Sequence, residues 1–360
     1  MKRSRKVICI IITFLLTLLV LWFFQALLMP KYQKGIVEGG MMAEYYRDTE
    51  VPHEVIFIGD CEVYENISTV ELYREYGISS YIRGSAQQLV WQSYYILEDT
   101  LRYETPRAVV YNVQALKYDA PQSESYNRMT LEGLRWSRTK WDAINESMTE
   151  EENMLDYLFP ILYYHDRWSS LKSEDFECIF DRDLISVNGY YMRADISPQE
   201  QFPDPPVLKD PNLGNNAMYW LNRITELCRR NGIELILVKS PTEYPFWYDS
   251  WDEQITAFAQ KNDLTYVNYI GLKDQIGLDM STDTYDGGLH LNIYGAEKYA
   301  DAIGALLLEN VELTDYRNVP EVASLWDNKA AFYDELYNAQ MAELQEYGRL
   351  ISWGMNAVEE

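Results

Sequence analysis

The first residues that could carry out chemistry lie directly after a short apolar run, in the sequence Gly59-Asp60-Cys61-Glu62. The run predicts a buried strand, and the residues that follow predict a turn into a helix. A thiol at a helix N-terminus is close to backbone N–H groups and to the helix dipole, which favour negative charge. This position predicts a lowered pKa and a reactive thiolate for Cys61. The alternative, a buried cysteine that serves as a small apolar side chain, stays open.

A second group of candidates precedes the last helical pattern and reads Tyr-Asp-Gly-Gly-Leu-His-Leu-Asn from residue 285. It contains His290, one of three histidines in the chain, with Asp286 four residues before it. An imidazole held by a carboxylate is a typical general base and acid, and two intervening glycines permit a tight turn. The alternative is that His290 caps the helix and that Asp286 only makes the turn.

Four further side chains are candidates for contact with a substrate: Asp60, Gln87, Lys239 and Trp247. Lys239 ends the strongest strand signal and could bind an anionic group, although a structural lysine that extends to solvent is an equal alternative. Trp247 belongs to an aromatic cluster, which suits sugar stacking but is more commonly packing. We find no metal-ligand spacing of His or Cys, no phosphate-binding glycine loop and no dinucleotide fingerprint, so neither a metal nor a cofactor is expected.

Short apolar runs alternate with helical patterns along most of the chain. Five runs predict strands, at residues 54–59, 79–83, 108–113, 233–239 and 264–269. Helical patterns follow or separate them, at 68–76, 87–103, 223–231, 251–262 and 291–308. Strands that are apolar throughout and alternate with helices are typical of a parallel sheet covered on both faces. The sequence therefore predicts an α/β fold, in which ligands bind at the carboxyl ends of the strands.

Two segments fall outside this alternation. Residues 114–212 separate the third and fourth strands, where a compact α/β unit needs only a short crossover. We therefore expect an α/β domain at 54–310 with an inserted helical cap over the strand ends. Residues 311–360 predict a helical C-terminal tail, rich in Glu and Tyr, that either lies against the body or reaches a partner.

The N-terminal residues predict a membrane anchor. Residues 7–29 form an apolar run of 23 residues without a charge, and about 20 residues span a hydrocarbon core. A cleaved signal peptide is the main alternative, but bulky rather than small residues end the run. Residues 1–6 are basic and a polar connector follows at 30–53, so the positive-inside rule predicts a single-pass protein of the cell membrane with a cytoplasmic N-terminus and an extracytoplasmic body.

Composition narrows the class of partner. The formal charge of −25 repels phosphate backbones, which argues against nucleic-acid binding. Outside the apolar run, Cys61, Cys178 and Cys228 form an odd set, so at least one is free or pairs with another chain. A Cys178–Cys228 disulfide and two buried thiols both stay open.

Taken in order, these blocks resemble the SGNH (GDSL-type) hydrolases and acyltransferases. Gly59-Asp60-Cys61 matches the Gly-Asp-Ser block, and Gly84 matches the glycine of the second block. Asp286 and His290 match the terminal Asp–His block. The resemblance covers about residues 54–112 and 233–308, and it implies a three-layer, flavodoxin-like parallel sheet.

The sequence around His290 is also similar to the HLNxxGA run of membrane-anchored Gram-positive members, with Gly295 and Ala296 in place. That layout resembles extracytoplasmic proteins that handle acyl groups on cell-wall polymers, including the protein for teichoic-acid D-alanylation. The partners that the resemblance implies are a cell-envelope glycan or teichoic acid and an acyl donor.

Three departures from the family pattern concern the reaction. Cys61 stands where the family has Ser, and a thiolate can transfer acyl groups by the same covalent route. Asp286 lies four residues before His290 rather than three, so Asp283 is a second candidate for the orienting acid. The Gly-x-Asn-Asp block is missing, and we expect Asn112 to complete an oxyanion hole with the N–H groups of Cys61 and Gly84.

The sequence thus gives two functional hypotheses. The first is a membrane-anchored esterase or O-acyltransferase with a covalent Cys-His-Asp mechanism through Cys61, His290 and Asp286. The second is a non-catalytic protein of the same fold that binds envelope glycan or an assembly partner. A redox role for Cys61 is disfavoured because no resolving cysteine lies in a CxxC arrangement.

Overall fold

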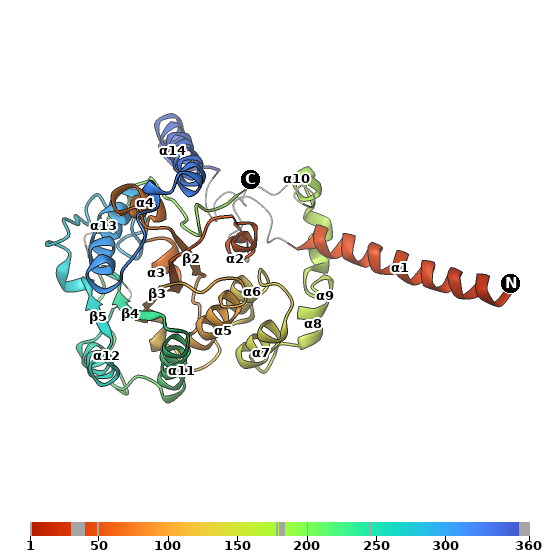
Figure 1. Ribbon diagram of the computed structural model, residues 1–360, viewed down its shortest axis with the longest axis horizontal. Coiled ribbons are helices and arrows are strands. Elements are labelled where there is room, and N and C mark those ends of the chain that lie inside the picture. Colours follow the sequence, from red (N-terminus) through yellow and green to blue (C-terminus); the bar gives the residue numbers. More distant parts are fainter. Residues whose placement is uncertain are drawn as a thin grey trace.

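Five parallel strands form one sheet at the centre of the molecule (Figure 1). The computed structural model describes residues 2–29, 40–48, 50–177, 179, 184–199, 201–244 and 246–352. The strands are β1 (Val55–Gly59), β2 (Ser80–Gly84), β3 (Ala108–Asn112), β4 (Glu234–Lys239) and β5 (Thr265–Asn268). Their order is β2-β1-β3-β4-β5, which is the flavodoxin-like order. All five predicted strands and the predicted α/β class are confirmed.

Helices cover both faces of this sheet. The helices are α1 (Lys2–Leu28), α2 (Gly40–Glu44), α3 (Cys61–Tyr64), α4 (Thr69–Tyr76), α5 (Val90–Thr100), α6 (Glu124–Leu131), α7 (Arg138–Ser147), α8 (Met154–Leu158), α9 (Ile161–Tyr164), α10 (Ser173–Glu177), α11 (Asn215–Asn231), α12 (Asp249–Asn262), α13 (Ile293–Asn310) and α14 (Pro320–Tyr347). Short 3₁₀ turns are η2 (Tyr45–Arg47), η3 (Val113–Lys117), η4 (His165–Ser170), η5 (Tyr269–Leu272) and η6 (Tyr316–Asn318).

Alternate strand residues supply two separate cores. Phe57 of β1 belongs to the cluster formed with α4, α13 and α14, whereas its neighbours Ile56 and Ile58 belong to the cluster formed with α5, α7, α11 and α12. This follows from the period of two in a strand, which sends successive side chains to opposite faces. Each fully buried aliphatic side chain contributes about 1.5–3 kcal/mol. The three-layer arrangement predicted from the sequence is confirmed.

Local signals set the ends of α4, as the sequence predicts. The Ser68 hydroxyl accepts a hydrogen bond from Glu71 N–H at 3.2 Å. At the other end Gly77 adopts a left-handed φ of 70° and closes the last turn. Only glycine takes this conformation without a steric penalty.

The insert is less regular than expected. Its helical pattern near residues 149–165 is divided into separate helices, since α8 ends at Leu158 and α9 begins at Ile161. Pro160 lies between them, and a proline disfavours helical backbone at the preceding residue, here Phe159. The helices of the insert are also only partly a cap. α7 packs on α5, α9 and α10 contact α1, and residues 184–199 reach the loops beyond the strand ends.

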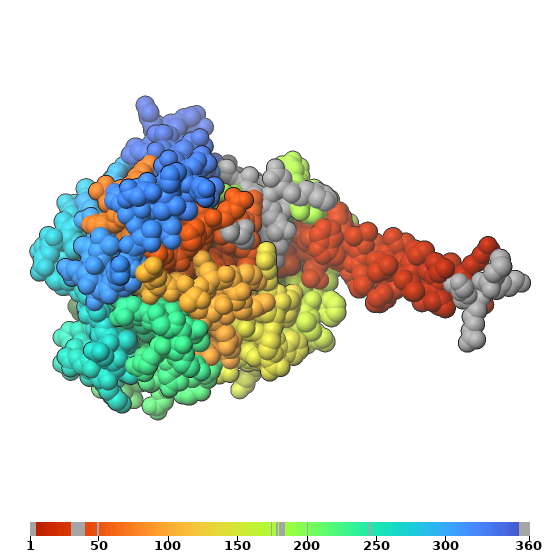
Figure 2. All heavy atoms as spheres, viewed as in Figure 1, coloured from red at the N-terminus to blue at the C-terminus, as the bar shows by residue number. Residues whose placement is uncertain are grey.

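Helix α1 projects away from the body. Figure 2 shows it standing clear of the rest of the chain, with the insert (yellow to light green) at its base. Residues Arg5–Leu28 of this helix are long and apolar enough to cross a membrane, a test that a signal sequence also passes.

The tail, whose position the sequence left open, packs against the body. Helix α14 buries Trp326 completely, and its ring stacks on Tyr73 of α4 at 4.9 Å between centroids. The Trp326 indole N–H also donates to the Ser79 hydroxyl at 3.1 Å, at the start of β2. The tail therefore forms part of the sheet's outer layer.

This packing predicts a large effect of Trp326→Ala. Removing a buried indole leaves a cavity, and such changes typically lower the free energy of unfolding by about 3–5 kcal/mol. Urea unfolding of the full chain in detergent, followed by near-UV circular dichroism, measures the change. Tyr347→Ala, at an exposed position of the same helix, should change stability by less than about 0.5 kcal/mol. Equal effects of the two substitutions would contradict the docking of α14.

Candidate active site

The site lies at the carboxyl ends of β1 and β2, where an α/β sheet presents its ligands. Cys61 begins the single-turn helix α3 directly after β1. Asp60 is its N-cap, and one carboxylate oxygen accepts a hydrogen bond from Glu62 N–H at 3.1 Å. The predicted turn between strand and helix is therefore present, with Cys61 partly exposed at its first position.

His290 and Asp286 are held together on the loop that precedes α13. Asp286 Oδ2 lies 2.6 Å from His290 Nδ1, and Asp286 Oδ1 accepts the backbone N–H of His290 at 2.8 Å. Gly287 and Gly288 have φ values of 76° and 89°, so this tight turn requires glycine. Asp283, the second candidate for the acid, instead pairs with Lys298 at 2.6 Å. The geometry thus assigns Asp286 rather than Asp283 to His290.

The Cys61 thiol and the His290 imidazole are neighbours. Each shifts the pKa of the other. His290 Nε2 is buried and has no hydrogen-bond partner of ordinary geometry among the described residues. A buried nitrogen without a partner is costly, and the thiol proton or a substrate oxygen is the group that this position can accommodate.

The charge state of the thiol differs from the expectation. Burial raises the pKa of Cys61 to about 11, and the carboxylates of Asp60 and Glu65 add to the rise. The imidazole of His290 acts in the opposite direction without reversing it. Helix α3 is only four residues long, so its dipole is weak. The predicted acidic thiol is therefore wrong for the resting site.

Glu65 is a site residue that our sequence reasoning missed. Its Oε2 lies 3.5 Å from His290 Nδ1, so two carboxylates flank one imidazole. Burial opposes a positive charge on His290, but Glu65, Cys61 and Asp286 outweigh it and raise the pKa well above its ordinary value. The pKa of Glu65 is itself raised by burial. Its spacing of four residues from Cys61, one helical turn, is the signal that could have identified it.

Aromatic and amide contacts fix the imidazole from other directions. The ring of Tyr285 lies nearly parallel to His290 with centroids 6.0 Å apart, and the Arg193 guanidinium covers Tyr285 at 4.5 Å. Asn66, which follows Glu65, accepts the N–H of Leu291 at 2.8 Å. The insert, through Arg193, therefore contributes to the position of the histidine.

Gly84 and Asn112, the two residues predicted to contribute to the oxyanion hole, lie in different surroundings. Gly84 packs tightly on the Cys61 turn, because a Cβ there would lie 2.5 Å from Val63 Cγ2 and 3.2 Å from the carbonyl oxygen of Asp60. Asn112, in contrast, has no amide proton left to donate to an oxyanion. Its Nδ2 donates to Glu62 at 3.1 Å and to Ser240 at 2.8 Å, which uses both amide protons. The prediction that Asn112 completes the hole is wrong.

Lys239 does not face a substrate either. It is fully buried, and its Nζ donates to both carboxylate oxygens of Glu62, at 2.8 and 2.9 Å. Thr242 Oγ1 accepts a third bond at 2.9 Å. Both the substrate-binding and the solvent-reaching interpretations of Lys239 are wrong, since it holds Glu62, the residue after Cys61, to the end of β4.

The other three candidate binding residues lie in different settings. Asp60 is buried as the cap of α3, and its pKa is raised to about 6 by burial and by Glu62. Gln87 is partly exposed in the turn after β2, with a left-handed φ of 50°. Trp247 donates to Asp252 at 3.4 Å and contacts Trp251, at the edge of the core on the α11–α12 side. A substrate contact of Gln87 or Trp247 stays a prediction.

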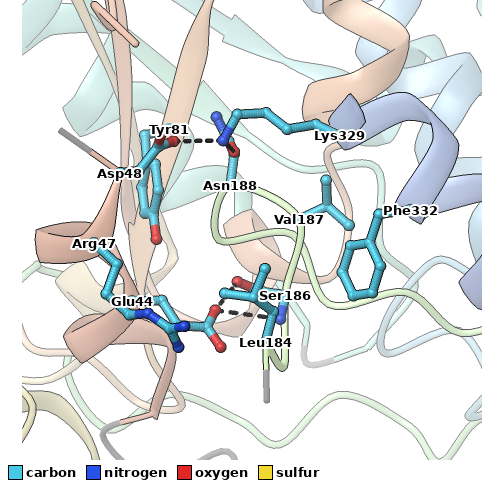
Figure 3. A pocket seen from close by; sticks show the side chains of 10 residues that line it. All are labelled: Glu44, Arg47, Asp48, Tyr81, Leu184, Ser186, Val187, Asn188, Lys329 and Phe332. Atoms are coloured by element: carbon cyan, nitrogen blue, oxygen red, sulfur yellow. Dashed lines mark hydrogen bonds and ion pairs between the residues drawn. The ribbon is translucent and has the colours of Figure 1, made fainter. Parts of the chain in front are cut away.

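A cavity of about 220 Å³ lies apart from Cys61 and His290, beside the start of β2 (Figure 3). Lys329 reaches across it to Asp48 at 2.7 Å and Asn188 at 2.6 Å. Glu44 accepts the N–H and the hydroxyl proton of Ser186. These polar side chains satisfy one another, so the cavity offers a ligand few free groups.

Two further findings concern cysteine and metal chemistry. Within the described part of the chain, no cluster of three His, Cys, Asp or Glu side chains is placed to hold a metal ion. Cys228 is buried and free. Cys178, its candidate disulfide partner, lies outside the described residues.

The chain matches no protein-family model and no curated protein. Among solved structures it is similar to a "putative acylhydrolase" from Bacteroides fragilis, at 13% identity and a TM-score of 0.38 over 78% of this chain and 100% of that one. It is also similar to a GDSL-like lipase from Bacteroides thetaiotaomicron, at 12% identity and a TM-score of 0.38 over 76% of this chain and 98% of that one. The fold class rests on the strand order described above.

The buried Glu62–Lys239 pair predicts a strong effect of Lys239→Met. Loss of the ammonium leaves a buried carboxylate without its counter-charge, which typically costs about 3–5 kcal/mol of the free energy of unfolding. Adding Glu62→Gln should restore part of that stability, and urea unfolding of the three proteins measures it. Lys273→Met is the matched control, because its pair with Glu243 is partly exposed and should be worth about 1 kcal/mol or less. A double variant no more stable than Lys239→Met would contradict this interpretation.

Proposed function

We propose that this chain is a membrane-anchored, extracytoplasmic SGNH-like esterase or O-acyltransferase that acts on cell-envelope polysaccharide or teichoic acid. The observation that carries the proposal is the Asp286–His290 hydrogen bond beside Cys61 at the carboxyl end of β1. A nucleophile, a base and an orienting acid supplied by loops beyond a parallel sheet suit acyl transfer. The order of the sequence blocks supports the SGNH type, and the raised pKa of the thiol limits the conditions under which the site works.

In the proposed reaction, Cys61 Sγ attacks the carbonyl carbon of an ester and His290 Nε2 accepts the thiol proton. The C–O bond breaks, and the leaving hydroxyl takes that proton from Nε2, which leaves a thioester on Cys61. Water or a sugar hydroxyl then gives its proton to Nε2 and attacks the thioester. The C–S bond breaks, and the proton returns to the thiol.

The charges around His290 set the pH at which this sequence begins. The pKa of His290 is raised above its ordinary value and that of Cys61 is raised as well, so the pair holds its protons to higher pH than the free side chains would. One proton must leave the pair before Nε2 can accept another. The proposed activity therefore rises toward alkaline pH. With Asn112 engaged elsewhere, the N–H groups of Cys61 and Gly84 are the remaining candidates for the oxyanion.

Membrane attachment is the second part of the proposal. Helix α1 has the length and composition of a membrane span, and about 20 apolar residues suffice. The basic residues at the start of α1 favour a cytoplasmic N-terminus, and in this orientation the body is outside the membrane with access to envelope polymers.

One observation favours a second function, a non-catalytic protein that binds envelope glycan or an assembly partner. A thiol with a pKa of about 11 is almost entirely unreactive at neutral pH. A chain that had lost the chemistry could keep the fold and the loops.

The electrostatics predict the pH dependence of Cys61 alkylation. In the full chain the rate should have a midpoint above the ordinary thiol value of about 8.5. His290→Ala should raise the midpoint, because the imidazole lowers the pKa of Cys61, and Glu65→Gln should lower it, because the carboxylate raises that pKa. Below the midpoint the rate is proportional to the thiolate fraction, so iodoacetamide labelling rates from pH 7 to 11, read by mass spectrometry of the Cys61 peptide, report both shifts as slower labelling of His290→Ala and faster labelling of Glu65→Gln at each pH. A midpoint that neither substitution moves would show that the three side chains are not assembled.

Acylation separates the enzyme from the binding protein. With p-nitrophenyl acetate at pH 9, intact-mass spectrometry should show one acetyl group that disappears in Cys61→Ala and persists in Cys228→Ser. Asp286→Asn should lower the rate of p-nitrophenol release by up to about 10⁴-fold, since the orienting carboxylate is lost. Full acetylation of Cys61→Ala would remove Cys61 from the mechanism. No acetylation of the unmodified chain would favour the binding protein.

A further inference from the structure

Short helices of the insert lie across the base of α1. In Figure 1 the column formed by α8, α9 and α10 runs transverse to α1, at the side of the body from which α1 projects. Both α9 and α10, with η4 between them, contact α1. The sequence indicated a helical pattern for this segment but not its contact with α1.

One arginine joins these elements. Arg167 Nη1 donates to the carbonyl oxygen of Leu28 at 2.7 Å, at the end of α1. Its Nη2 donates to Asp175 Oδ1 of α10, also at 2.7 Å. The last residues of α1, Leu27 and Leu28, are buried in the body, as is Met29. The helix therefore leaves the body at a fixed place.

The length of α1 determines where the point at which it leaves the body lies relative to a bilayer. Residues 7–26, which precede the two buried leucines, rise 1.5 Å each and give about 30 Å, the thickness of the hydrocarbon core. Almost no helix remains to separate the body from the membrane. If α1 spans, then α9, η4 and α10 lie at the level of the lipid headgroups.

Large apolar side chains are exposed along this same segment. Leu155, Phe159, Leu162, Trp168 and Phe176 are 51%, 47%, 50%, 71% and 47% exposed. We call these five residues the juxtamembrane face. Trp is enriched at membrane interfaces, and Trp, Phe and Leu form the apolar face of helices that lie in the interface plane. Large apolar side chains exposed together in one segment are typical of a site of interaction.

We propose that the juxtamembrane face inserts into the headgroup region of the bilayer that α1 spans and holds the body against the membrane. The inference rests on the membrane anchoring in the proposed function, but not on the chemistry of Cys61. Arg167 fixes the segment to the end of α1, and the length of α1 places it at the lipid surface.

The charges indicate which force holds the face there. Residues 154–177 carry five acidic and two basic side chains, so anionic headgroups repel the segment. Apolar burial must supply the attraction. Because α1 tethers the face, insertion is intramolecular, at an effective concentration in the millimolar range, and a weak affinity is enough. Insertion should therefore need no anionic lipid.

Site-directed spin labelling of the full chain tests this proposal. Single cysteines replace Leu162, Trp168, Phe14 and Tyr219 in a chain whose own four cysteines are serine, with one chain in each phosphatidylcholine nanodisc. Phe14 reports on α1, and Tyr219 is an exposed residue of α11. Power saturation compares collisions with oxygen, which partitions into lipid, and with a nickel chelate, which stays in water. Labels at 162 and 168 should favour oxygen, as should 14, whereas 219 should favour nickel.

The possible results test the membrane anchor and the insertion of the juxtamembrane face separately. If 162 and 168 favour nickel while 14 favours oxygen, the anchor holds and the proposed insertion is wrong; the face would then cover a partner protein or a second copy, neither of which a single-chain nanodisc contains. If 14 also favours nickel, anchoring and insertion are both wrong. Brominated phosphatidylcholine gives a second measurement with the native cysteines in place. It should quench a fluorescence component that Trp168→Phe removes and Trp247→Phe keeps, and equal quenching in both variants would overturn the proposal.

Discussion

The buried ion pair between Glu62 and Lys239 is the constraint on which the candidate site depends. Glu62 directly follows Cys61, and Lys239 ends β4, so the pair ties the turn after β1 to the far side of the sheet. Asn112 and Ser240 complete the network from β3 and from the residue after β4. A buried pair does not by itself add stability, but losing one partner is costly, so it specifies a single arrangement. The ion pair and its hydrogen bonds therefore hold the turn that carries the Cys61 thiol.

The distribution of charged side chains around Cys61 explains why its thiol is not acidic. Asp60, Glu62 and Glu65 all lie within five residues of Cys61, yet only Glu62 has a buried lysine of its own. Asp60 and Glu65 are left to disfavour a thiolate; the charge of Glu65 is compensated first by His290, and that of Asp60 by Lys117. These charges disfavour the loss of a proton from either His290 or Cys61. If substrate binding removes a proton from His290 and Cys61, that loss of a proton is itself a step of catalysis.

The sequence was sufficient for the strands and for the Asp286–His290 contact, because both depend on local patterns. Apolar runs marked all five strands, and two glycines with a nearby acid marked the loop. The roles of Asn112 and Lys239 were missed because they depend on which side chain lies opposite in three dimensions, and Glu62 occupies both. Glu65 was identifiable by its spacing from Cys61, yet only its distance to His290 distinguishes it from a surface acid. Pairings between distant segments are what a single sequence does not contain.

The insert connects the two ends of the molecule that the sequence treated separately. Its helices α9 and α10 meet the end of α1, while residues 184–199 reach the site loops: Tyr191 N–H donates to the carbonyl oxygen of Tyr64 at 2.7 Å, and Ile293 N–H to that of Arg193 at 2.7 Å. The insert therefore contacts both the end of α1 and the loop that carries His290. For an enzyme acting on envelope polymers, a fixed distance between membrane and nucleophile would select which part of an anchored polymer it reaches. That gives the long insert a physical reason to persist beside a sheet that does not require it.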